Sequence, residues 1–419
     1  MRNPSKARGW GRRAPSIRLA GILALAIAAA SASLCAQEGK GWIGKQVVQR
    51  SSDFSLRVGS KVERMKDFEA YRVEKVSGPW LGLRSFNHAG WASATDVIPI
   101  EQAIGVYSDA IRKSPKDDQL YVLRSAAREA HGEFDEALDD ASEAVRLAPD
   151  KAGNLVGRAV IFLKKKDYRA AITDLDAALR RDRQSGPAYN TRGVVRGALG
   201  EFDAAIADFD IAIRLQPRCP RFFANRGFTR ANKEDFDEAI ADLNEAIRLD
   251  PDLAVAYLRR GIVENWRKRP DQAMADLDHA IRLDVSSSEA FKYRAIFHYQ
   301  RGRFAQSVSD LETAARLDPK DLSFLNNAAW IRATCPDPGV RDGKLAVDFA
   351  TKVCEADGGK DPNTLGTFAA ACAEAGDFAR AVELRAKANA MLKDAKAKKK
   401  GEEQLKLYQE KTPYREAKP

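Results

Sequence analysis

Charged side chains recur along this chain with a fixed period. Six arginines are evenly spaced, and an aspartate follows each of them at a second constant interval. The arginines are Arg124, Arg158, Arg192, Arg226, Arg260 and Arg294, and the aspartates are Asp140, Asp174, Asp208, Asp242, Asp276 and Asp310. A guanidinium and a carboxylate at a constant separation predict one ion pair within each repeating unit. We interpret these pairs as structural, with six copies holding six equivalent units together.

No pattern in the sequence predicts catalysis. The histidines His88, His131, His279 and His298 are scattered, and none forms a metal-binding pair of the His-Glu-x-x-His type. The sequence also has no glycine-rich phosphate loop and no Gly-x-Ser-x-Gly elbow. Asp-x-Asp pairs such as Asp174/Asp176 fall inside predicted helices, where residues two apart point in different directions. The sequence therefore predicts a binding protein with no catalytic residues, no metal and no cofactor.

Other residue types follow the same period as the arginines. Small residues recur at Ala103, Ala137, Ala171, Ala205, Ala239, Ala273 and Ser307. Aromatic residues recur at Tyr121, Tyr189, Phe223, Tyr257 and Phe291, and prolines at Pro115, Pro149, Pro217, Pro251 and Pro319. Gly132, Gly200 and Gly302 stand between the apolar segments, where a chain leaving one helix needs a left-handed residue. Each period thus predicts one hairpin of two helices.

This pattern resembles the tetratricopeptide repeat, whose 34-residue period and small, aromatic and proline positions it matches. The array covers residues 101–321, as a half unit over 101–117 and full units over 118–151, 152–185, 186–219, 220–253, 254–287 and 288–321. Two divergent units follow over 322–392. The resemblance implies a mainly α protein, a right-handed α-solenoid whose concave groove is lined by the first helix of each hairpin. It also implies that the partners are other proteins or peptides.

Residues that vary between units are candidates for lining the groove, because hairpin packing does not require them. The candidates are Val160, Asn190, Val194, Asn225, Phe228, Leu258, Ile262, Trp266, Tyr293 and Ile296. Leu258, Ile262 and Trp266 form a stripe along one helix face. If the set faces the groove, a peptide with apolar anchors is the expected ligand. The alternative is that these side chains contact the next repeat and belong to the core.

The amino terminus has the composition of a secretion signal. Six basic residues and no acidic residue occur in residues 1–36, and an apolar run from Leu19 to Ala32 ends among small residues. We expect cleavage after Ala32 or Ala36, and export to the periplasm or cell envelope. The run is shorter than the roughly 20 residues that span a bilayer, so a retained anchor is the less favoured alternative, and no membrane span is expected after cleavage.

Residues 37–100 predict a small all-β domain of about five strands. Alternating or apolar segments occupy residues 45–49, 70–76, 80–83 and 90–94. The run Gly78-Pro-Trp80 and the later Gly90-Trp91 resemble bacterial SH3-like domains, which implies a small barrel. Trp42, Trp80 and Trp91 are expected to be buried in that barrel, and an exposed aromatic binding surface is the alternative. Relatives of this type often contact the bacterial cell wall, which makes peptidoglycan a second possible partner.

The net charge of +10 is carried by the two ends of the chain. Residues 393–419 contain a basic run around Lys398, Lys399 and Lys400, but acidic residues follow it and no aromatic residue interrupts it. We therefore expect a solvated helix end and no binding of nucleic acid. Cys219, Cys335, Cys354 and Cys372 leave disulfides and buried thiols equally open.

The sequence as a whole predicts an exported scaffold that binds peptide segments of other cell-envelope proteins in a tetratricopeptide groove. The alternative is a cell-wall-directed module, in which the β domain binds peptidoglycan and the repeats act as a spacer or adaptor.

Overall fold

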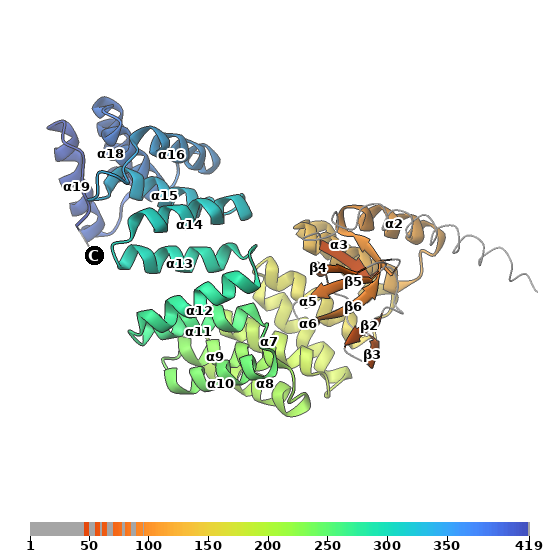
Figure 1. The fold of residues 1–419 in the computed structure, drawn as a ribbon. Coiled ribbons are helices and arrows are strands. Elements are labelled where there is room, and N and C mark those ends of the chain that lie inside the picture. Colours follow the sequence, from red (N-terminus) through yellow and green to blue (C-terminus); the bar gives the residue numbers. More distant parts are fainter. Residues whose placement is uncertain are drawn as a thin grey trace, which may run out of the picture. The chain divides into compact units, whose positions relative to one another are not determined.

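The computed structural model describes residues 46–49, 55–58, 61–64, 70–77, 80–84, 89–94 and 96–417. The predicted signal peptide and Trp42 lie outside the described residues. The chain divides into two compact units, Met1–Pro217 and Arg218–Pro419, each of which is considered by itself (Figure 1). The first contains a β-sheet followed by helices, and the described part of the second is helical.

The sheet has seven described strands. They are β1 (Gln46–Gln49), β2 (Ser55–Val58), β3 (Lys61–Arg64), β4 (Ala70–Ser77), β5 (Trp80–Arg84), β6 (Ala89–Ser93) and β7 (Val97–Pro99). All pairs are antiparallel, in the order β3-β2-β6-β5-β4-β1-β7. The predicted segments correspond to β1, β4, β5 and β6. The sequence analysis does not predict β2 and β3, which are short and rich in polar residues.

The two faces of the sheet are buried by different partners. Leu56, Tyr71 and Leu81 belong to a core within the sheet itself. Val48, which is next to the inward-facing Val47, points to the opposite face and packs with Tyr107 and other side chains of the first two helices. The β domain is thus continuous with the start of the helical array, because one apolar cluster joins them.

The helices of the first unit form hairpins. They are α2 (Ile100–Lys113), α3 (Asp118–His131), α4 (Phe134–Leu147), α5 (Ala152–Lys164), α6 (Tyr168–Arg181), α7 (Gly186–Ala198) and α8 (Phe202–Leu215). The most extensive packing joins α3 to α4, α5 to α6 and α7 to α8, with α2 as the predicted half unit against α3. The periodic alanines make this close packing possible, since Ala137, Ala171 and Ala205 are fully buried.

The second unit continues the same arrangement. Its helices are α9 (Pro220–Asn232), α10 (Phe236–Leu249), α11 (Ala254–Trp266), α12 (Pro270–Leu283), α13 (Ser288–Gln300), α14 (Phe304–Leu317), α15 (Ser323–Thr334), α16 (Gly343–Asp357), α17 (Pro362–Glu374), α18 (Phe378–Met391) and α19 (Ala395–Gln409). From α3 to α18, odd-numbered helices are the first helices of hairpins and even-numbered helices the second. The predicted mainly α fold of stacked hairpins behind a small β region is confirmed.

Each of the six hairpins from α3 to α14 turns through a left-handed residue. Gly132, Gly200 and Gly302 have φ of 79°, 80° and 69°, as their positions in the period predict. The intervening units place Lys166, Glu234 and Lys268 at the same positions, with φ of 62°, 70° and 60°. Tertiary packing of the hairpins therefore imposes this backbone conformation even where the sequence has no glycine.

The basic segment after residue 393 differs from its expected form. We predicted a solvated helix end, but α19 packs against α18 and buries Gly401, Gln404 and Tyr408. These residues are spaced three or four apart and share one helix face, while Lys396, Lys398, Lys399 and Lys406 are exposed. The basic composition of residues 393–419 suggested a solvated helix, although their apolar and small residues recur at helical spacing. Cys335, Cys354 and Cys372 in this unit carry free thiols. No helix in the described part of the chain is long and apolar enough to cross a membrane.

Candidate functional site

The periodic arginines and aspartates meet across each hairpin. In all six units the arginine Nε and Nη2 atoms donate to the two carboxylate oxygens of the paired aspartate on the second helix, at 2.6–2.9 Å. The aspartates are buried, with 2–8% of their surface exposed. Hydrogen bonding to the carboxylate raises the pKa of the arginine, as for Arg124 beside Asp140. Such two-point pairs fix the orientation of the first helix on the second.

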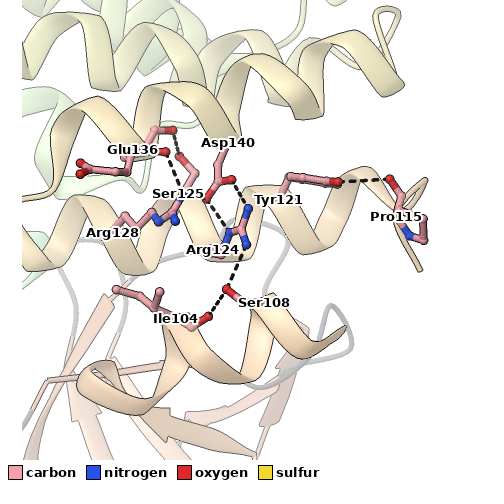
Figure 2. Close-up of polar contacts among 10 residues, drawn as sticks. Ile104, Ser108, Pro115, Tyr121, Arg124, Ser125, Arg128, Glu136 and Asp140 are labelled. Carbon is pink, nitrogen blue, oxygen red and sulfur yellow. Dashed lines mark hydrogen bonds and ion pairs between the residues drawn. The ribbon is translucent and has the colours of Figure 1, made fainter. Parts of the chain in front are cut away.

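In several repeats the remaining arginine nitrogen, Nη1, reaches the preceding helix pair or half unit. Arg192 Nη1 donates to Asp176 at 2.7 Å, and Arg294 Nη1 donates to Asp278 at 2.8 Å. Figure 2 shows the first full repeat, α3 and α4. Arg124 lies there between Asp140 and Ser108 and donates to the Ser108 hydroxyl at 2.9 Å. This second contact explains the second aspartate of the Asp-x-Asp pairs that end at Asp176 and Asp278. We call the six arginine–aspartate pairs the ladder. Through these contacts the ladder joins neighbouring repeats as well as the two helices of one hairpin.

The periodic aromatic residues support the same arginines. The guanidinium of Arg192 lies 5.4 Å from the ring centroid of Tyr189, and that of Arg294 lies 5.4 Å from the ring of Phe291. An aromatic face attracts a guanidinium. No cluster of histidine, cysteine, aspartate and glutamate suited to a metal ion occurs among the described residues. The hydrogen bonds of these arginines join helices of the array.

The predicted groove residues separate into packed and accessible groups. Leu258 and Ile262 are 4% and 2% exposed and belong to the core between α11 and its neighbours, so the core alternative holds for these two. Trp266 and Ile296 are 42% and 40% exposed. In the compact unit Met1–Pro217, Val160 on α5 and Asn190 and Val194 on α7 are partly buried. The accessible apolar side chains among the candidates therefore lie on α11 and α13 of the second unit.

Aromatic and polar contacts connect α9 with α11. The rings of Phe228 and Trp266 stack with centroids 6.1 Å apart. Arg259 Nη1 donates to Asn225 Oδ1 at 2.6 Å, and its guanidinium lies 5.3 Å from the ring centroid of Phe228. These four side chains come from two successive first helices, so they form one continuous surface.

Arg259 differs from its neighbour Arg260 in its electrostatic surroundings. Arg260 is paired with Asp276, whereas no carboxylate lies within ion-pair distance of Arg259 among the described residues. Desolvation lowers the pKa of Arg259 to about 10, with the more distant Glu289 acting in the opposite direction. The guanidinium is therefore charged at neutral pH and is not neutralised by a direct ion pair, while the residue as a whole is partly exposed.

The surface continues onto α13. Tyr293 and Ile296 are three residues apart and share one helix face. Lys292 Nζ lies 5.0 Å from the Tyr293 ring centroid, and Asn265 Nδ2 donates to Gln300 Oε1 at 3.4 Å between α11 and α13. Burial, and then the Glu289 carboxylate, raise the pKa of Tyr293. Asn225, a predicted groove residue, is only 6% exposed and lies buried beneath this surface. We use the term inner surface for the set Phe228, Arg259, Trp266, Tyr293 and Ile296.

Two residues of this region were missed by the sequence analysis. Arg259 stands one repeat period after Asn225 and one period before Tyr293, so the period itself marks it. Trp330 stands one period after Ile296, but it lies in a divergent unit. Arg259 was not a candidate because the candidates were chosen mainly for apolar side chains. Trp330 was not a candidate because the arginine–aspartate pair that marks each repeat is absent after residue 321.

The tryptophans of the β domain are more accessible than expected. We predicted that Trp80 and Trp91 would be buried, but Trp80 is 38% exposed and Trp91 is partly exposed. With Arg57 and Ser77 they line a shallow hollow of about 200 Å³, and the Arg57 guanidinium lies 5.0 Å from the Trp80 ring centroid. Smaller side chains fill the core of this sheet, which leaves the tryptophans at its surface.

A family model described as tetratricopeptide repeat matches residues 100–152, 124–187 and 190–254. These segments carry tetratricopeptide repeats. The matched ranges include four of the six arginines of the ladder, although the hairpins beyond residue 254 keep the same arrangement of helices. No curated protein matches the chain.

Several solved structures with helical repeats are similar to the chain. The Cut9–Hcn1 hetero-tetramer of the APC/C is 16% identical with a TM-score of 0.48, over 54% of this chain and 45% of that one, so the match spans less than half of the other protein. YrrB, described as a tetratricopeptide protein with an unusual peptide-binding site, is 22% identical with a TM-score of 0.33, over 46% and 99% of the two chains. A tetratricopeptide protein from Parabacteroides merdae is 16% identical with a TM-score of 0.40, over 72% and 98%.

Adjacent arginines of one repeat unit provide a matched test of the two charge environments. We expect Arg260→Met to destabilise the protein by about 3 kcal/mol or more, because it leaves the buried Asp276 without its partner. We expect Arg259→Met to change stability by less than about 1 kcal/mol, because the lost hydrogen bond is offset by removal of a desolvated charge. Urea unfolding followed by circular dichroism measures both. Equal destabilisation by the two variants would contradict this assignment.

Proposed function

We propose that this protein is an interaction scaffold that binds peptide segments of partner proteins on the inner surface of its second unit. The observation that carries the proposal is the exposure of Trp266 on α11 and Ile296 on α13, together with Arg259 on α11, a charged group without a direct ion pair. Tryptophan, tyrosine and arginine are the residues that most often dominate the energy of protein interfaces. The surface presents all three on consecutive first helices.

The charge of the surface favours a segment that contains an acidic residue. Arg259 and Lys292 supply positive charge beside the aromatic rings of Phe228 and Tyr293. Glu289 is the acidic residue whose charge raises the pKa of Arg259, and it is exposed to solvent. A ligand carboxylate near Arg259 would neutralise a desolvated cation, and such charge-assisted hydrogen bonds are stronger than those between neutral groups. An apolar side chain of the same segment would pack on Trp266 or Ile296.

A pair of aliphatic-to-aspartate substitutions tests the surface. Peptides selected from a phage-displayed 12-residue library on the full chain are expected to lose binding, by at least about tenfold in Kd, to Ile296→Asp. Val285→Asp is the matched control, since Val285 is 60% exposed in the turn between α12 and α13. Fluorescence anisotropy measures both affinities. Equal affinities for the two variants would place the selected peptides elsewhere.

We also propose that the scaffold acts outside the cytoplasm, among proteins of the cell envelope. The support is the amino-terminal composition described above, in which basic residues precede an apolar run and small residues. Expression in bacteria followed by fractionation is expected to place the chain in the periplasmic fraction, with a mass that corresponds to cleavage after Ala32 or Ala36. Deletion of residues 2–36 is expected to retain it in the cytoplasm. A full-length chain in the cytoplasmic fraction would contradict export.

A second candidate function involves the β domain. The exposed ring of Trp80 beside Arg57 is the observation that favours it, because aromatic rings next to a cation suit ligands with flat apolar faces and anionic groups. If this hollow binds the cell wall, the chain will sediment with isolated peptidoglycan and Trp80→Ala will reduce the bound fraction severalfold. Val62→Ala, at a 65% exposed position on β3, is the control. Absence of sedimentation by the unaltered chain would remove this candidate.

A further inference from the structure

A segment near the carboxyl end lies against α15 and α17, the first helices that follow those of the inner surface. After α19 the chain reverses at Lys411, and residues 412–417 continue without regular secondary structure. The ring of Tyr414 lies 6.0 Å from that of Trp330 on α15, and the Glu416 backbone N–H donates to the Thr334 carbonyl at 2.9 Å. The segment thus returns to the first helices after passing α18.

Charged groups hold the segment at three points. The Trp330 indole N–H donates to the Glu416 carboxylate, and Lys400 Nζ lies 3.6 Å from the other oxygen of that carboxylate. Arg415 Nη2 lies 2.5 Å from Glu374 at the end of α17, and its Nη1 donates to the Ala333 carbonyl at 3.2 Å. Every one of these protein partners except Lys400 lies on a first helix.

The segment also reaches α13. Burial, and then the adjacent Glu416 carboxylate, raise the pKa of Tyr299 to about 12. Tyr299 follows Ile296 by three positions and lies near it on the helix surface. The hydrogen bonds, ion pairs and ring contact of residues 412–417 with first helices thus lie on α15 and α17, and Glu416 lies near Tyr299 of α13.

Trp330 relates this contact to the inner surface. It occupies the position that Phe228, Ile262 and Ile296 occupy in the preceding units, each one repeat period before the next. An exposed apolar side chain at this position remains uncovered in α13, whereas Tyr414 covers the equivalent side chain in α15. Tyr414 thus packs on Trp330 at the repeat position where Ile296 is exposed on α13 and Ile262 is buried on α11.

We infer that residues 412–417 are an intramolecular occupant of the peptide-binding face, so that α13, α15 and α17 accept a partner segment of the same chemistry only after this segment leaves. The chemistry is an aromatic residue followed two positions later by an acidic residue, as in Tyr414 and Glu416. This inference rests on the proposed function. It assumes that the first helices bind peptides, and it assigns α13, α15 and α17 to peptides that resemble residues 412–417. A linked segment competes at an effective concentration of about millimolar, so it excludes weak ligands and yields to tight ones.

The test uses a fluorescein-labelled peptide with the sequence of residues 410–419. We expect it to bind a chain that ends at Lys411 at least about tenfold more tightly than it binds the full chain, as measured by anisotropy. The same peptide carrying Tyr414→Ala and Glu416→Gln is expected not to bind. A truncated chain with an unchanged circular dichroism spectrum that binds the peptide no better than the full chain would overturn the inference.

A second variant covers the case in which the truncated chain does not fold. Tyr414→Ala/Glu416→Gln in the full chain keeps α19 and its contacts but removes the two anchors. It is expected to bind the unaltered peptide severalfold more tightly than the wild-type chain, and equal affinity overturns the inference.

The outcomes also separate this inference from the proposed function. Library peptides that depend on Ile296, together with no gain in binding of the 410–419 peptide, would leave the proposed function intact and reject the occupant. Binding of the 410–419 peptide to the truncated chain without any library peptide would confine recognition to α13, α15 and α17 and reject the surface centred on Trp266.

Discussion

The two-point hydrogen bonding between one arginine and one buried aspartate is the constraint on which the rest of this fold depends. Each arginine spans from the first helix of its hairpin to the second, and in units such as that of Arg192 it also reaches the preceding hairpin. A carboxylate that is only 2% exposed, like that of Asp208, needs this pairing, because an isolated buried charge is strongly unfavourable. The pair therefore fixes which face of each first helix points toward its own hairpin.

The same pairing leaves the other faces of each first helix free of the arginine–aspartate contact. Small side chains and the arginine–aspartate pair complete the packing within the hairpin, so other positions vary without loss of the fold. In the second unit these positions hold Trp266, Ile296 and Arg259, and further along they hold Trp330. The chain's own residues 412–417 contact Trp330 through Tyr414 and Glu416.

Periodic features of the fold are the ones that the sequence predicts well. The hairpins, their turns and the arginine–aspartate pairs follow from identical residues at identical spacing. Lys166, Glu234 and Lys268 adopt left-handed conformations that their residue types do not suggest, because packing on both sides determines the turn. The strands β2 and β3 are missed for a related reason, since cross-strand pairing stabilises segments whose own pattern is weak.

The candidate site is predicted only in part, because burial depends on neighbours that single positions do not reveal. Leu258 and Ile262 share a stripe with Trp266, yet the first two enter the core while the third reaches solvent. Trp80 is accessible because smaller side chains complete the core of the sheet. The position of residues 412–417 depends on α19 reversing the direction of the chain, which has no counterpart in the repeat period.

Hydrogen–deuterium exchange of the full chain with a saturating library-selected peptide tests the central claim most directly, because it reports which helices a ligand stabilises. Our account predicts slower exchange along α11 and α13, with little change in α10, α12 and α14. Slower exchange confined to the second helices, or to the β domain alone, would contradict the assignment of the first-helix face as the binding surface.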